Sequence, residues 1–172
     1  WALKIKNIGI VDVAWAALMG LSGIFCAVIG TGTPVARVAV ALMSGLWAWR
    51  LFYSLYKRVS HEPEDGRYQA LRAAWNGSAG KFFIFFQGQA VIVALFSLPF
   101  IAAANNATAS INIWFVLAVA IFVVSVAGES IADKQLAVFR NNPDNRGKTC
   151  RNGLWAWSRH PNYFFEWLHW FA

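Results

Sequence analysis

The chain has 172 residues, of which 58% are hydrophobic and only 13% are charged, and its formal net charge at pH 7 is +7. Soluble domains are about 45–50% apolar and about 25% charged, so this composition argues against a soluble domain and indicates a membrane protein. The two cysteines, Cys26 and Cys150, lie in an apolar run and in a basic loop, so we expect no disulfide between them. No spacing of Cys and His residues indicates a zinc site.

Four long apolar segments predict membrane-spanning helices, because a bilayer core is crossed by roughly 20 apolar residues. These segments are residues 8–30, 38–56, 82–104 and 111–128. A fifth begins near Asn162 and runs to Ala172. We therefore expect an all-α, polytopic helical bundle that forms a single membrane-embedded domain over residues 1–172. Because the chain opens on Trp1 rather than Met and stops inside an apolar run, we expect both ends to be truncated.

The distribution of basic residues predicts the orientation, because membrane-protein loops rich in Lys and Arg face the cytoplasm. Lys4 and Lys6 precede the first span, and further basic residues gather in segments 57–81 and 134–159, whereas the loop 104–110 carries no charge. We therefore expect the N-terminal edge and both basic loops on the cytoplasmic side, with a bacterial inner membrane as the expected location.

The net positive charge follows from this bias together with contacts to anionic membrane lipids. The basic residues are divided among loops between spans, and the chain contains no RNA- or DNA-binding motif. Membrane lipids are therefore expected partners of this protein, whereas nucleic acid is not.

The segment after the fourth span is the richest in polar side chains. A helical pattern continues beyond that span, and the spacing of Glu129, Asp133 and Arg140 places them on one helix face. Asn, Pro and Gly residues break the helix over residues 141–147, and Lys148 follows. Such cations bind phosphates, carboxylates bind ribose hydroxyls and amides bind a nicotinamide or adenine edge, so the segment can hold a nucleotide. A solvated basic loop explains the same residues equally well.

The step Arg159-His160-Pro161-Asn162 predicts the start of a helix, because proline fits the first helical turn. Asn162 and Glu166 then lie one turn apart on one face, and Glu166 is surrounded by aromatic residues. Ionisable groups at that depth in a membrane usually face a cavity or a partner, so we favour a functional role for Glu166. The alternative is that Glu166 reaches water or pairs with Arg159.

Two charged residues lie inside the first two spans. Asp12 and Arg50 both fall in the third of their span nearest the cytoplasm, so the simplest interpretation is that they pair with each other. Alternatively, an apolar site keeps Asp12 protonated, so that it donates a hydrogen bond to a substrate carbonyl. Between spans two and three, the spacing of Tyr68, Leu71 and Trp75 predicts a short interfacial helix.

The polar residues of roughly the last quarter of the chain resemble the steroid 5α-reductase family, especially its bacterial membrane branch. The matching positions are Asp133, Arg140 and Pro143, then Gly153-Leu154-Trp155, then Ser158-Arg159-His160-Pro161-Asn162-Tyr163 with Glu166 and Trp167. The loop Glu64-Asp65-Gly66-Arg67-Tyr68 also looks like that branch. The resemblance implies a helical membrane bundle of about seven spans, NADPH as hydride donor, and reduction of a carbon–carbon double bond conjugated to a ketone in a steroid or another lipophilic substrate.

Family roles carry over to named residues of this chain. The resemblance implies NADPH contacts for Glu129, Asp133, Arg140, Lys148, Arg159 and Asn162, with an amide usual in the family at the position of Glu129. Glu166 matches a carboxylate near the nicotinamide, so we predict a catalytic role for it. The catalytic tyrosine and acid of the family have no marked motif here. Tyr53 and Trp47 lie in the region of the tyrosine, and we select Tyr53, with Asp12 as the acid. Two departures, Ala137 for an arginine and His169 for a second glutamate, leave the substrate open.

Two other classes of function remain open. Membrane methyltransferases of the isoprenylcysteine carboxyl type also carry an Arg-His-Pro-x-Tyr step before a helix, and they bind S-adenosylmethionine there. The lead-in Gly153-Leu154-Trp155 and the pair Asn162 and Glu166 favour the reductase. The third class is a non-enzymatic scaffold that binds lipids or sterols.

Overall fold

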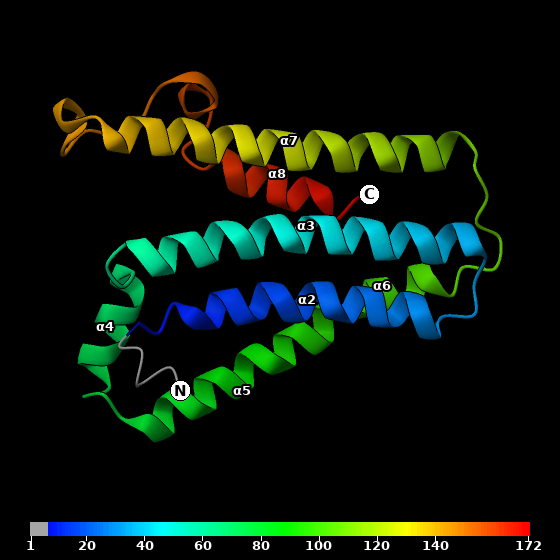
Figure 1. Ribbon diagram of the computed structural model, residues 1–172, viewed down its shortest axis with the longest axis horizontal. Coiled ribbons are helices and arrows are strands. Elements are labelled where there is room, and N and C mark those ends of the chain that lie inside the picture. Colours follow the sequence, from blue (N-terminus) through cyan, green and yellow to red (C-terminus); the bar gives the residue numbers. More distant parts are fainter. Residues whose placement is uncertain (1–6) are drawn as a thin grey trace. The chain divides into compact units, whose positions relative to one another are not determined.

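The computed structural model describes residues 7–172, and all regular elements of this range are helices, as predicted (Figure 1). The elements are α2 (Ile10–Ile29), α3 (Pro34–His61), α4 (Gly66–Ala74), α5 (Ala79–Phe96), α6 (Leu98–Ala104), α7 (Ile113–Asn141), the 3-10 turns η1 (Pro143–Asn145) and η2 (Gly153–Ala156), and α8 (Pro161–His169). Lys4 and Lys6 lie outside the described residues. The chain forms two compact units, Trp1–Ser110 and Ile111–Ala172, and each is described by itself.

Four helical segments of the described residues are long and apolar enough to cross a membrane, which confirms the four predicted spans. The segments are Ile10–Ile29, Pro34–His61, Ala79–Ala104 and Ile113–Asn141. The second and fourth are longer than predicted, with 28 and 29 residues. At 1.5 Å per residue they exceed a hydrocarbon core of about 30 Å, so their last turns continue as ordered helix beyond the membrane. The protein is thus an all-α membrane protein.

The third span is interrupted, whereas we predicted one helix over residues 82–104. The break falls at Ser97, where α5 ends and α6 begins. Pro99 causes it, because proline has no N–H to donate to the carbonyl of Leu95 and its ring crowds that carbonyl. The span also starts three residues earlier than predicted, at Ala79.

In the first unit, α2 and α3 pack antiparallel through small side chains (Figure 1). Gly20 faces Ala48 and Gly23 faces Ser44, and a Cβ atom on either glycine would collide with its neighbour. Close backbone approach at small residues is a common way for membrane helices to associate, because lipid tails provide no hydrophobic drive for it. These two glycines therefore fix the distance between the first two spans.

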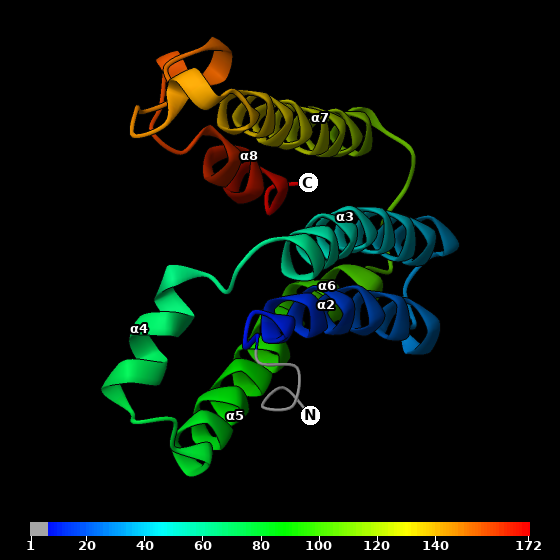
Figure 2. The same ribbon diagram turned by 60° about the vertical axis from the view of Figure 1, so that its left-hand side comes forward.

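The predicted interfacial helix is present as α4, which lies between the end of α3 and the start of α5 (Figures 1 and 2). Asp65 caps it by accepting a hydrogen bond from the backbone N–H of Arg67 at 2.9 Å. Tyr68 is buried in an apolar cluster with Ile8 and Phe82. This cluster holds α4 against the first residues of α2 and the first turns of α5.

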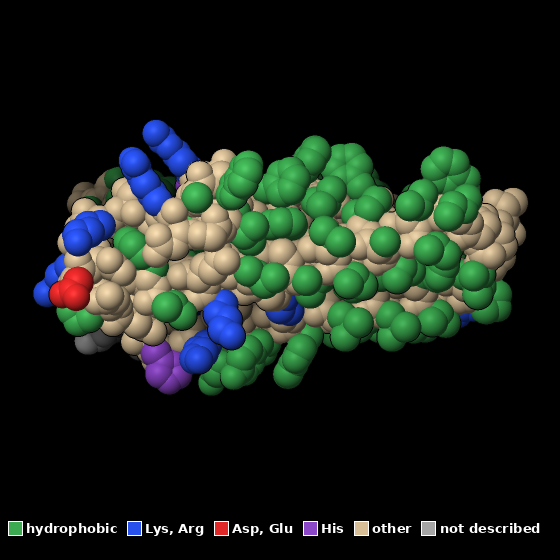
Figure 3. Space-filling model, turned by 90° about the horizontal axis from the view of Figure 1, so that it is seen from above, with side chains coloured by type: hydrophobic (Ala, Val, Ile, Leu, Met, Phe, Trp, Pro, Cys, Tyr) green, Lys and Arg blue, Asp and Glu red, His purple; other side chains and the backbone are tan. Residues whose placement is uncertain are grey.

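In the second unit, α7 continues without interruption past Gly128 to Asn141, as predicted from its pattern. Figure 3 shows hydrophobic side chains along α7, with Lys and Arg gathered at the end where α7 finishes. The helix predicted near Asn162 begins at Pro161, and its regular part, α8, has nine residues. It runs antiparallel to α7, and Gly128 leaves the space that the ring of Phe165 occupies.

Candidate functional site

The segment Gly153-Leu154-Trp155 is docked on α7 by two hydrogen bonds. The backbone N–H of Leu154 donates to Oε1 of Gln135 at 2.9 Å, and the indole Nε1 of Trp155 donates to the carbonyl of Ala132 at 2.9 Å. Gly153 has φ +59°, and a Cβ atom there would collide with Gln135. Glycine is thus required for this turn both by its backbone conformation and by space.

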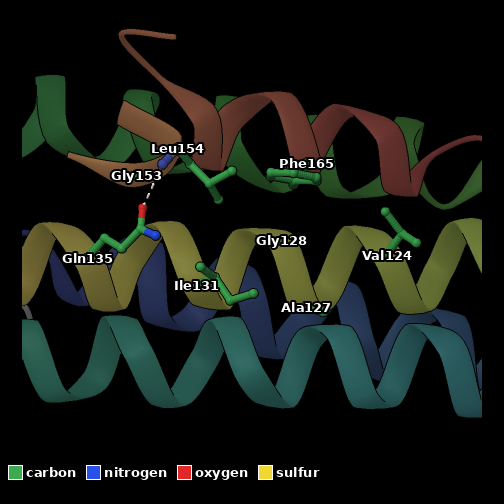
Figure 4. Close-up of a pocket in the computed structure, with 8 residues that line it drawn as sticks. All are labelled: Val124, Ala127, Gly128, Ile131, Gln135, Gly153, Leu154 and Phe165. Carbon is green, nitrogen blue, oxygen red and sulfur yellow. Dashed lines mark hydrogen bonds between the residues drawn. The ribbon is translucent and has the colours of Figure 1, made fainter. Parts of the chain in front are cut away.

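An apolar groove of about 430 Å³ lies between α7 and the segment formed by η2 and α8 (Figure 4). Its lining residues are Val124, Ala127, Gly128, Ile131, Gln135, Gly153, Leu154 and Phe165. In Figure 4, Gln135 reaches from α7 to Leu154 and closes one end of the groove. The groove is therefore framed by the residues that place α8 on α7.

Two residues predicted to bind a cofactor meet across α7 and α8. Nδ2 of Asn162 donates to Oδ1 of Asp133 at 3.4 Å, which joins positions that are 29 residues apart in the chain. The second amide atom of Asn162, Oδ1, is buried and accepts no hydrogen bond from residues 7–172. Asn162 therefore keeps one acceptor available for a ligand.

The two glutamates of this region lie at a similar depth along α7 and α8. Glu129 is one turn before Asp133 and is 6% exposed. Glu166 is half-buried and follows Phe165, whose ring rests on Gly128. Along the helix pair of α7 and α8, both carboxylates therefore lie about one turn further from the basic loop than the contact between Asp133 and Asn162.

The three predicted phosphate-binding cations, Arg140, Lys148 and Arg159, all have exposed side chains. Arg140 is in the last turn of α7, and the loop that follows is tied back by Nδ2 of Asn145, which donates to the carbonyl of Phe139 at 2.9 Å. None of the three cations forms an ion pair within the described residues. They are therefore free to contact an anion in solution.

This arrangement contradicts the alternative that Glu166 pairs with Arg159. Arg159 lies two residues before α8 and is exposed, whereas Glu166 is in the second turn of that helix. Arg159 forms no ion pair with any carboxylate of residues 7–172.

The pairing predicted between Asp12 and Arg50 is wrong. Oη of Tyr68 donates to Oδ1 of Asp12 at 2.6 Å, and a guanidinium nitrogen of Arg67 lies 3.6 Å from Oδ2. Both partners come from the interfacial helix α4. Two donors of α4 thus face the carboxylate of Asp12.

The register of α2 and α3 explains this outcome. Gly20 lies opposite Ala48. Asp12 precedes Gly20 by eight residues, whereas Arg50 follows Ala48 by only two, so Arg50 lies opposite a point about six residues further along α2. At 1.5 Å per residue this is roughly 9 Å deeper than Asp12. Residue spacing within each span alone does not reveal such an offset.

Further ion pairs surround the contact between Asp12 and Tyr68. Glu64 accepts a hydrogen bond from the backbone N–H of Ile8 at 2.7 Å and one from Arg72 at 2.9 Å. Burial raises the pKa of Glu64, but these two hydrogen bonds lower it further than burial raises it, so the pKa of Glu64 lies below its ordinary value. Burial and the hydrogen bond to Asp12 raise the pKa of Tyr68 well above its ordinary value. Tyr68 is therefore a neutral donor at physiological pH.

The structure does not bring Tyr53 to Asp12. Tyr53 is 58% exposed on α3, and Trp47, the other residue in the predicted region, is fully buried. The tyrosine that meets Asp12 is Tyr68, which is 5% exposed. The sequence carried one signal for this contact: Asp12 and Tyr68 both lie at the end of the predicted spans where the basic segments gather.

Comparison with known proteins finds a family whose model matches the whole chain. Residues 1–172 match the model of a family described as "Protein of unknown function (DUF1295)". The chain belongs to this family. The DUF1295 chain is also similar to an uncharacterized protein of Schizosaccharomyces pombe, with 25% identity over 201 residues, covering 100% of this chain and 58% of that protein. The chain thus spans less than two thirds of that relative's length. No solved structure matches it.

Proposed function

We propose that this protein is an NADPH-dependent membrane reductase that acts on a carbon–carbon double bond conjugated to a ketone in a lipophilic substrate, a steroid or another enone lipid. The observation that carries the proposal is the contact between Asp133 and Asn162, which joins two halves of the motif that resembles the steroid 5α-reductases. Oδ1 of Asn162 is buried and has no hydrogen-bond partner among residues 7–172, so we propose it as an acceptor for a ligand. An acceptor of this kind suits the amide N–H₂ of a nicotinamide.

The charged rim of the same unit supports binding of a dinucleotide. The segment from Glu129 to Asn162 contains six Lys and Arg residues and three carboxylates. Arg140, Lys148 and Arg159 are exposed and bind phosphates by charge-assisted hydrogen bonds in this proposal. Asp133 accepts from a ribose hydroxyl, and Glu166 orients the reacting end of the cofactor.

Bound NADPH would supply the hydride for the β-carbon of the enone, and a proton delivered to the α-carbon would complete the reduction of the double bond. The protein binds and orients the reactants and handles that proton. A hydrogen-bond donor at the carbonyl stabilises the enolate charge that develops, and exclusion of water by the membrane strengthens this interaction. We assign the donor role to Tyr68 instead of Tyr53, because Asp12 positions the hydroxyl of Tyr68.

The first test is cofactor binding to the purified protein, measured separately for NADPH and S-adenosylmethionine. Binding of NADPH alone is expected. Binding of S-adenosylmethionine alone would favour the methyltransferase, and binding of neither would favour the non-enzymatic scaffold.

The phosphate contacts give a sharper prediction. Arg140→Ala and Lys148→Ala should each weaken NADPH binding at least tenfold, because each removes a charge-assisted hydrogen bond of about 1.5–3 kcal/mol. Lys57→Ala, a change to an exposed cation of the other unit, is the matched control and should leave the affinity unchanged. An NADPH affinity equal to that of the wild type in all three variants would show that the basic loop only sets the topology.

A further inference from the structure

A second groove lies in the first unit, at the corner between α4 and α5. It has a volume of about 280 Å³ and is lined by Trp75, Lys81, Ile84 and Phe85. It lies at the end of the span Ala79–Ala104 where the basic loop 57–81 meets the membrane. Its lining is apolar apart from the ammonium of Lys81.

The apolar wall of this groove is fixed by ring packing. The indole of Trp75 packs edge-on against Phe82 at 5.0 Å and against Phe85 at 5.9 Å between centroids. Phe82 is buried, so it supports Trp75 from behind. Ile84 is 71% exposed and extends the apolar surface toward the membrane interior. Tryptophan is typical of the membrane–water boundary, which places the mouth of the groove at headgroup level.

Lys81 differs from the arginines at the same end of the unit. Arg58 and Arg67 lie 3.8 and 3.2 Å from oxygens of Asp65, and Arg72 lies 2.9 Å from Glu64. Among the residues that the structure describes, no carboxylate pairs with Lys81. No carboxylate of residues 7–172 therefore compensates the cation at the mouth of the groove.

We propose that this groove binds one anionic phospholipid, whose phosphate contacts Lys81 and whose acyl chain lies along Ile84 and Phe85. The charge of Lys81 selects an anionic headgroup, and the apolar surface beyond it selects a lipid over a soluble anion. None of the four lining residues is among the residues assigned a role in the proposed reductase activity.

The test measures lipid retention. The full chain is reconstituted in nanodiscs that contain equal amounts of phosphatidylglycerol and phosphatidylcholine, extracted in mild detergent, and analysed by native mass spectrometry for bound lipid. We expect the wild-type protein to retain phosphatidylglycerol preferentially. Lys81→Ala should lower this preference about fivefold, which corresponds to about 1 kcal/mol for one lysine near a membrane surface. Lys57→Ala, which removes an exposed cation outside the groove, should retain the wild-type preference.

Two outcomes would overturn the proposal. An unchanged preference of Lys81→Ala for phosphatidylglycerol would show that Lys81 does not contact the headgroup. An equal loss of this preference in Lys57→Ala would show only a general effect of surface charge. Ile84→Asn tests the acyl-chain contact separately, because an exposed side chain can change without loss of the fold. It should lower retention of phosphatidylglycerol, and unchanged retention would show that the groove holds no acyl chain.

Discussion

The hydroxyl of Tyr68 connects the interfacial helix to the first span. It is buried, it donates to Asp12 at 2.6 Å, and Arg67 stands beside the same carboxylate. A buried hydroxyl of this kind either stabilises the docking of α4 or acts on a substrate. The two roles differ in what the removal of one oxygen atom would change.

Tyr68→Phe keeps the ring in its apolar cluster and removes only the donor. If Tyr68 polarises the substrate carbonyl, turnover of an enone at saturating NADPH should fall roughly 10²-fold, while NADPH affinity stays constant. Tyr53→Phe is the matched control and should remain active. Full activity of Tyr68→Phe together with loss in Tyr53→Phe would return the role to Tyr53.

Glu166 poses a similar question in the second unit. Glu166→Gln keeps the shape and one acceptor oxygen but removes the charge. If Glu166 orients the nicotinamide or the substrate, this variant should fold normally and turn over an enone more slowly than the wild type. If Glu166 only stabilises α8, turnover should be unchanged and the melting temperature should shift by a small amount. A fully active Gln variant would thus contradict the functional role.

At the scale of elements, sequence patterns located the helices better than their contacts. The uninterrupted α7 and the interfacial α4 both follow from apolar periodicity, which is a local property of the chain. The break at Ser97 was missed because hydropathy is insensitive to the lost donor of Pro99. Arg50 was wrongly predicted to pair with Asp12, because the depth of Arg50 depends on the register between α2 and α3, which small residues such as Gly20 set in three dimensions.

The docking of α4 should depend on pH. The pKa values of Glu64 and Asp65 are lower in the folded state than their ordinary values of about 4. At a pH above those ordinary values, both carboxylates therefore stabilise the folded state. This contribution is lost as the pH falls through the lowered pKa values. Glu64→Gln should lower the melting temperature at pH 7 by a few degrees, since 1 kcal/mol corresponds to roughly 2–4 °C for a chain of this size. The difference from wild type should shrink at pH 3.

Glu62→Gln provides the control for that experiment. Glu62 is exposed and adjoins the same loop, but it takes part in no ion pair within residues 7–172. Its substitution should leave the melting temperature unchanged at both pH values. A difference between Glu64→Gln and wild type that persists at pH 3 would show that shape, not charge, holds α4.

At the scale of the whole molecule, residues 7–172 contain four candidate spans, and the chain has an asymmetric distribution of charge. Composition alone predicted the membrane class, because too few charged residues are present to cover a soluble fold. The site was predicted only in part, since Asp133 and Asn162 meet whereas the cations remain spread over an exposed loop. No sequence pattern specifies where long, exposed side chains of this kind lie in space.

The last prediction concerns the sides of the membrane. The loop around Asn105 carries no charge, and the loop around Asp144 lies among Lys and Arg residues. We propose that the basic loops are cytoplasmic, because positive charge is retained on that side during insertion. In a variant whose native cysteines are replaced, a cysteine at Asn105 should react with a membrane-impermeant thiol reagent applied to intact cells. A cysteine at Asp144 should react only after the membrane is opened. The reverse pattern would place the Asp133–Asn162 site on the side without NADPH and would therefore contradict the proposed function as well as the topology.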